Sequence, residues 1–181
     1  MNLRTHPMQT IGDCAIFAFR LEPASDDPTE RLMRSVSIFV DGVNFTEHDS
    51  IVYVPQFIHS LKQTVNKLNN IDLNRYKKIW RGEDPENIHT KLTVGNLIED
   101  SQWADMLADL QFLEFGETTY NLLSFFIPRD NNCWITCQSV EDPEIQGSIH
   151  SVCIDFDDLI KCISDTADII EVDFAKVEKN M

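Results

Sequence analysis

Glycine is scarce in this chain, with six residues among 181. Loops that cradle phosphate and the Gly-x-Ser-x-Gly turn of serine hydrolases both need closely spaced glycines, and the sequence contains neither pattern. The five histidines lie at positions 6, 48, 59, 89 and 150, with no pair spaced to share one helix face as zinc ligands do. We therefore predict a non-enzymatic protein with no metal site and no cofactor.

Long hydrophobic runs are also missing. The longest apolar stretch, around Leu122 to Ile127, is far too short to span a bilayer. The first residues contain no apolar core of signal-peptide length. Without an export signal, the five cysteines are expected to be reduced thiols that pack as small hydrophobic residues. The sequence thus predicts a cytoplasmic protein that does not associate with membranes.

Positive charge is scarce as well, because 15 Lys and Arg face 30 Asp and Glu. Residues 1–91 hold 11 bases and 12 acids, net −1, whereas residues 92–181 hold 4 and 18, net −14. An excess of acid argues against direct binding to a nucleic-acid backbone, which needs a basic surface. Acidity also favours solubility, but solubility alone does not require this asymmetry. A one-sided field of this kind attracts and holds a cationic partner.

Hydrophobic periodicity predicts the strands and helices. Alternating apolar residues indicate strands over 12–21 and 36–40, and Asp41-Gly42 supplies the backbone conformation of a tight hairpin turn. Apolar stripes at helical spacing indicate helices from Pro55 to about Asn69, from near Ser101, and from Phe156 onward. Further strands are expected at 119–127, apolar on both faces and therefore central, at 133–140 and at 148–154.

These elements, without repeats or a linker rich in glycine or serine, predict one α+β domain spanning residues 1–181. We expect a largely antiparallel sheet with about three packed helices.

Asp155-x-Asp157 follows an apolar strand and precedes a helix, as the nucleophile and general acid do in magnesium-dependent haloacid-dehalogenase phosphatases. Too few residues follow to supply that fold's later lysine and metal-binding acids, and Asp158 stands where that family has Thr or Val. We favour Asp155 as a helix N-cap, with Asp157 and Asp158 in the first turn and Asp157 paired with Lys161. A phosphohydrolase using Asp155 and Asp157 is the alternative.

Two charged segments could contact a partner. Glu141, Asp142 and Glu144 lie in a loop between predicted strands, either as a solvated turn or as a rim that meets lysines and arginines. We predict a partner-binding surface made by the residues Glu141, Asp142, Glu144, Asp157, Asp158 and Asp165. The basic, aromatic segment 75–81 has the composition of a nucleic-acid contact, but against the overall charge we interpret it as a solvated edge or an internal counterion.

The segments Ser37-Ile-Phe-Val-Asp-Gly-Val-Asn44 and Trp80-x-Gly82 are similar to immunity family 42 of bacterial contact-dependent growth-inhibition and polymorphic-toxin systems. That resemblance implies a non-enzymatic antidote that binds one cognate toxin domain, commonly a nuclease, in the cytoplasm, and it transfers no catalytic residue. A nuclease is cationic where it holds its substrate, so an inhibitor that presents carboxylates competes for the same cations. An acidic adaptor for a basic protein is a further alternative.

Overall fold

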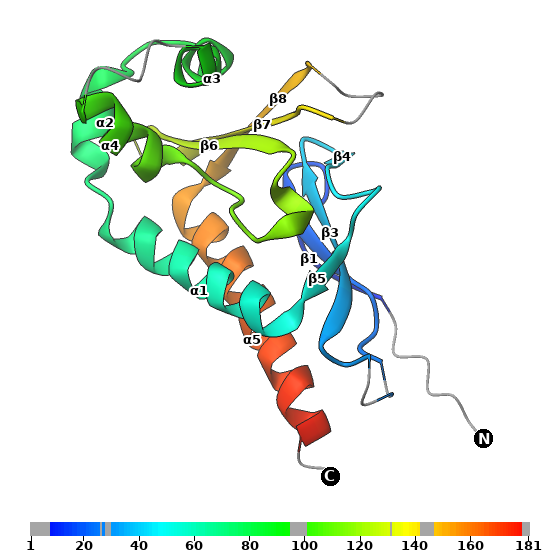
Figure 1. Ribbon diagram of the computed structural model, residues 1–181. Coiled ribbons are helices and arrows are strands. Elements are labelled where there is room, and N and C mark those ends of the chain that lie inside the picture. The colour runs from blue at the N-terminus through cyan, green and yellow to red at the C-terminus, as the bar shows by residue number, and fades with distance from the viewer. Residues whose placement is uncertain are drawn as a thin grey trace.

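Within the residues that it describes, the computed structural model contains two antiparallel sheets and five helices. Figure 1 shows how these elements are arranged. The residues that this structure describes are 8–25, 27, 30–94, 101–130, 132–141 and 147–178. This architecture confirms the predicted α+β class. Within the described residues, no helix combines the length and the apolar character that a membrane crossing requires.

The larger sheet has five strands in the order β1-β2-β3-β4, with β5 also pairing with β3. Its strands are β1 (Gln9–Asp13), β2 (Phe17–Leu21), β3 (Met33–Val40), β4 (Val43–Asn44) and β5 (Ile51–Tyr53). The predicted hairpin turn is confirmed, because Asp41 and Gly42 both have positive φ angles, 52° and 77°, between β3 and β4.

The prediction of one strand over 12–21 was wrong, because the chain reverses within that stretch. Gly12 has a φ of +91°, and the carboxylate of Asp13 accepts a hydrogen bond of 2.9 Å from the backbone N–H of Ala15. Asp and Gly are the residues that favour such turns. Phe17 and Phe19 do share a buried strand face, so the alternation was interpreted correctly and the turn before it was missed.

The smaller sheet contains β6 (Leu122–Pro128), β7 (Asn132–Ser139) and β8 (Ile149–Asp155), with β7 in the middle. The stretch predicted as a central strand is therefore an edge strand. Its outer edge is covered by the chain that precedes it, where the N–H of Phe112 donates a 2.8 Å hydrogen bond to the carbonyl of Ser124. Its apolar faces are explained by packing on both sides, because Phe125 contacts His89 and Phe126 contacts Phe156.

The helices are α1 (Val54–Asn70), α2 (Leu73–Ile79), α3 (Pro85–Val94), α4 (Ser101–Leu110) and α5 (Phe156–Glu178). Three of them, α1, α4 and α5, were predicted from their apolar stripes, and within the described part of the chain α2 and α3 bring the expected number of about three to five. Asp72 caps α2 by accepting hydrogen bonds from the backbone N–H groups of Asn74 and Arg75. Figure 1 shows α2, α3 and α4 gathered at one end of the molecule.

His89 fastens α3 to the smaller sheet. Its fully buried ring lies 2.9 Å from the Thr136 hydroxyl through Nδ1 and 3.3 Å from the Gln138 amide oxygen through Nε2. An amide oxygen can only accept, so Nε2 is the protonated nitrogen and Nδ1 accepts from Thr136. Burial lowers the pKa of His89, which keeps the ring neutral, although the hydrogen bond to Gln138 and the charge of Glu86 oppose that shift.

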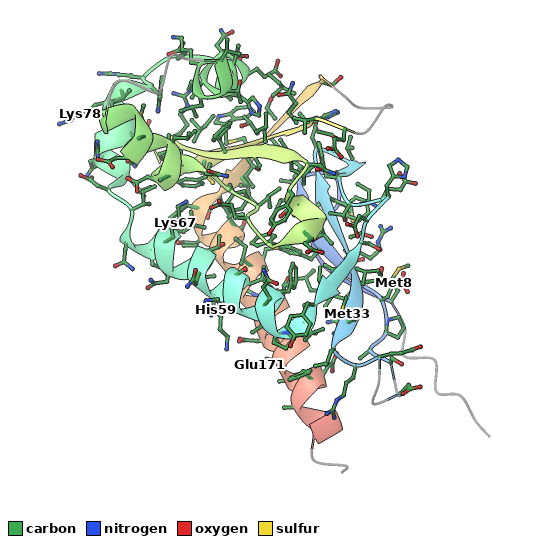
Figure 2. All side chains as sticks on the ribbon, viewed as in Figure 1. Met8, Met33, His59, Lys67, Lys78 and Glu171 are labelled. Carbon is green, nitrogen blue, oxygen red and sulfur yellow. The ribbon has the colours of Figure 1, made fainter. Side chains whose placement is uncertain are left out.

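Phenylalanine rings fill the core between the larger sheet, α1 and the segment after α4. Phe19 contacts Phe17, Phe57 and Phe115 at centroid distances of 5.3, 6.3 and 5.9 Å. On α1, Lys67 points toward the end of α4 (Figure 2), and its Nζ donates to the carbonyls of Ala108 and Gln111 at 2.6 and 2.8 Å. These contacts hold α1 in place, and α5 packs against α1.

Candidate functional site: the acidic face of helix α5

The first turn of α5 is built from consecutive acidic residues. Strand β8 ends at Asp155, whose Oδ1 accepts hydrogen bonds from the backbone N–H groups of Asp157 at 2.9 Å and Asp158 at 3.3 Å. Asp155 is thus the predicted N-cap. Asp157 and Asp158 are exposed in the first turn, where the positive end of the helix dipole stabilises negative charge.

Helical spacing carries the acidic surface along α5. Asp157, Asp165 and Asp168 recur at intervals that bring them to the outer face, and Asp158 lies beside them. The opposite face is fully buried through Leu159, Ile163 and Ile170. We call Asp157, Asp158, Asp165 and Asp168 the α5 acidic face; it extends about 17 Å at the ordinary rise of a helix.

Ion pairs divide α5 into two unlike halves. Toward its C-terminal end, Glu171 pairs with Lys62 of α1 at 2.7 Å and Asp173 pairs with the buried Arg34 at 3.2 Å. These acids are therefore neutralised within the fold, and Figure 2 shows Glu171 on this part of the helix.

Toward the N-terminal end, Lys161 pairs with Asp165, so the predicted pair with Asp157 was wrong. The hydrogen bond to Asp165 and its charge raise the pKa of Lys161, and Asp158 adds to the same effect. Among the described residues, Asp157, Asp158 and Asp168 form no ion pair.

Two clefts flank this half of α5. The first, which we call the β8–α5 cleft, has a volume of about 410 Å³ and is bounded by α2, the β6–β7 turn and the start of α5. The second, of about 260 Å³, lies between α5 and the β1–β2 hairpin. Asp157 lines the first cleft, and Asp158 and Asp165 line the second. The acidic face therefore separates two hollows.

The other predicted partner-binding residues do not join this surface. Glu141 is exposed just after β7, at the end of the smaller sheet that is opposite Asp155. The length of β8 alone separates the two regions by about 20 Å. Asp142 and Glu144 lie outside the described residues. The structure thus brings Asp157, Asp158 and Asp165 together and leaves Glu141 apart.

The basic segment 75–81 belongs to α2 and the turn after it. The Nζ of Lys77 donates to the backbone carbonyl of Asp130, and Trp80 is buried. Two of its members therefore serve the packing of α2 against the β6–β7 turn. Among the described residues, no three His, Cys, Asp or Glu side chains are arranged to hold a metal ion.

Sequence reasoning missed Asp168 and both clefts. Asp168 is eleven residues after Asp157, which is close to three helical turns, so the helical period would have found it. The clefts have no such signal because each is assembled from elements distant in sequence. The chain matches no family model, no curated protein and no solved structure.

Proposed function

We propose that this protein is a non-enzymatic immunity protein that uses the α5 acidic face to bind and neutralise a cationic toxin domain. We propose further that this toxin domain is a nuclease. The observation that carries the proposal is the set of exposed carboxylates without ion pairs on the N-terminal half of α5. The resemblance of the segments 37–44 and 80–82 to immunity family 42 supports the same class of function.

Electrostatics supports the choice of partner. Half of the chain carries nearly the whole net charge of −15, and three of its exposed carboxylates that form no ion pair within the described residues lie together on α5: Asp157, Asp158 and Asp168. Such a surface increases the association rate with a cationic partner and selects against anionic ones. A nuclease must hold phosphates with lysine and arginine, so carboxylates in the same places compete directly for those side chains.

The phosphohydrolase alternative assigns catalytic roles to Asp155 and Asp157. It needs Asp155 as a nucleophile, whereas one oxygen of this carboxylate accepts two backbone hydrogen bonds as a helix cap. The helix start thus has an explanation that requires no substrate. An acidic adaptor shares the same surface and differs from an immunity protein in selectivity, since an adaptor binds several basic proteins in a strongly salt-dependent way.

Co-expression with the toxin domain encoded by the adjacent reading frame tests the proposal. We expect restored growth and a stable 1:1 complex. Replacing Asp157, Asp158 and Asp168 together by Asn should slow association about tenfold or more at low salt. A matched variant that neutralises the exposed residues Glu47, Asp49 and Glu117 removes the same charge elsewhere and should have a much smaller effect. Failure to rescue growth, or equal effects of both variants, would contradict the proposal.

A further inference from the structure

The β8–α5 cleft combines an apolar floor with an acidic rim. Four apolar side chains line it, and they come from three separate elements: Leu73, Phe126, Pro128 and Phe156. Phe126 is 1 % exposed and packs against the half-buried Phe156, with ring centroids 5.7 Å apart, so Phe156 is the ring that a ligand can reach. The volume of about 410 Å³ is within the range of sites that hold small molecules, roughly 300–1,000 Å³. The cleft therefore has room for a long side chain to lie against the aromatic floor.

Three carboxylates line the cleft: Asp130, Asp155 and Asp157. Asp155 uses its Oδ1 to cap α5, and the described residues provide no ion pair to any of the three. None of these three carboxylates is therefore neutralised by a direct ion pair within the described residues.

Two cations lie nearby, and both are engaged by backbone. The guanidinium of Arg129, which also lines the cleft, donates to the carbonyls of Trp80 and Glu83 in the α2–α3 connection. Lys77 donates to the carbonyl of Asp130. Both positive groups hold the β6–β7 turn against α2, and the rim carboxylates keep their capacity to accept hydrogen bonds.

We propose that this cleft receives an arginine side chain of the cationic partner. The carboxylates alone would accept any cation, but the aromatic floor favours a cation that can stack on a ring. A guanidinium is planar, is weakly hydrated and stacks on aromatic rings, and it donates two parallel hydrogen bonds to one carboxylate. A lysine ammonium is strongly hydrated and presents a compact charge with no planar face. The identity of the partner rests on the proposed function, whereas the chemistry of the cleft does not.

The experiment is a titration of the full chain followed by two-dimensional amide NMR. The probes are Nα-acetyl-L-arginine amide and Nα-acetyl-L-lysine amide, which carry the same net charge. We expect the arginine probe to shift the amide signals of Asn132, Phe156 and Asp157 in a saturable way. The lysine probe should bind about two- to fivefold more weakly, since it gains less from the aromatic floor.

Variants separate the cleft from general attraction to an acidic protein. Asp157→Asn should weaken the arginine probe about two- to fivefold, while Glu47→Gln, an equal loss of charge at an exposed site away from the cleft, should leave its affinity unchanged. Phe156→Leu keeps the cleft apolar but removes one ring, so it should abolish the preference for arginine over lysine. Unchanged signal dispersion in the amide spectrum confirms that each variant is folded.

Shifts spread over the whole of α5, equal affinity for both probes or equal losses in Asp157→Asn and Glu47→Gln would overturn the cleft proposal. Its failure is distinguishable from failure of the proposed function. Growth rescue that depends on the α5 acidic face but not on Phe156 would keep the immunity function and remove the cleft. Selective binding of the arginine probe without growth rescue would support the cleft proposal and contradict the immunity function.

Discussion

Replacement of Asp155 distinguishes a helix cap from a catalytic nucleophile. In the protein its Oδ1 accepts hydrogen bonds of 2.9 and 3.3 Å from two backbone N–H groups at the start of α5. Alanine removes both bonds, and N-cap losses of this kind cost about 1 kcal/mol, within roughly 0.5–2. The cost is transmitted to the whole fold, because α5 carries the buried core residues Leu159 and Ile163.

Asparagine retains an oxygen that can accept the same hydrogen bonds and ranks with aspartate as an N-cap. It loses only the attraction between a negative charge and the helix dipole, which is worth about 0.3–1 kcal/mol. We therefore expect Asp155→Asn to cost clearly less stability than Asp155→Ala, with an unchanged dependence of unfolding free energy on urea.

Urea denaturation followed by tryptophan fluorescence measures both variants. Equal destabilisation by Asn and Ala, or no loss with Ala, would refute the capping role. The phosphohydrolase alternative predicts a different pattern. In that case Asp155→Asn abolishes the turnover of phosphate esters, whatever its effect on the free energy of unfolding.

Two further predictions concern the fold. Burial lowers the pKa of His89, so the unfolded chain binds a proton more readily than the folded one; stability should be full above the ordinary pKa of 6.5 and should fall as the pH drops below it. His89→Gln should flatten this dependence in urea titrations at pH 7.5 and about 5.5, whereas His59→Gln at an exposed site should not. Gly12→Ala would place its Cβ 2.3 Å from the carbonyl oxygen of Phe17 at a φ of +91°, so we expect a loss of about 3 kcal/mol in unfolding free energy. Gly42→Ala has a similar φ of +77° but open space around it, so a loss of only about 1–2 kcal/mol is expected, and an equal cost at both positions would show that the clash is irrelevant.

Elements with one apolar face were predictable from sequence because their period is independent of the rest of the fold. Strand β3 alternates buried residues, and α1 and α5 bury a single stripe. Helices α2 and α3 have no comparable apolar stripe in their sequences. They are held in place by contacts with residues that are distant in the chain. His89 is buried only because the distant Thr136 and Gln138 satisfy its ring, and no local pattern contains that information.

Strand β6 shows a different limit. Its two apolar faces predicted a covered strand, and the residues from Ser124 to Pro128 are buried as expected, whereas Leu123 is exposed. Burial, however, does not determine position in a sheet. The segment around Phe112 covers its edge after the chain leaves α4, and the left-handed conformation of Leu113, with a φ of 57°, is part of that path.

Part of the candidate site was predictable for the same reason as the helices. Asp157 and Asp158 follow a recognisable cap, and Asp165 follows them on the same helix. Glu141 looked equivalent in sequence, but the strands place it at the other end of the smaller sheet. Which charged residues form one surface depends on the distances between elements in the fold. The amino-acid composition contains no information about these distances.

Under the proposed function, helix stability and partner binding make opposite demands at Asp168. The acids of the first turn are favoured by the helix dipole, so the fold alone explains Asp157 and Asp158. Asp168 lies well beyond the first turn, and its neighbours one turn away, Asp165 and Glu171, are also acidic. Like charges at this spacing destabilise a helix by about 0.2–0.5 kcal/mol at most, and the pairing of Asp165 with Lys161 and of Glu171 with Lys62 reduces that cost.

Asp168→Asn should therefore leave stability unchanged or raise it slightly, and under the proposed function it should slow association with the proposed cationic toxin domain. Thermal or urea unfolding measures the first effect, and the salt dependence of the association rate measures the second. Loss of stability without a change in association would mean that Asp168 serves the fold. Unchanged or increased stability together with slower association would assign Asp168 to the proposed binding surface and not to the fold.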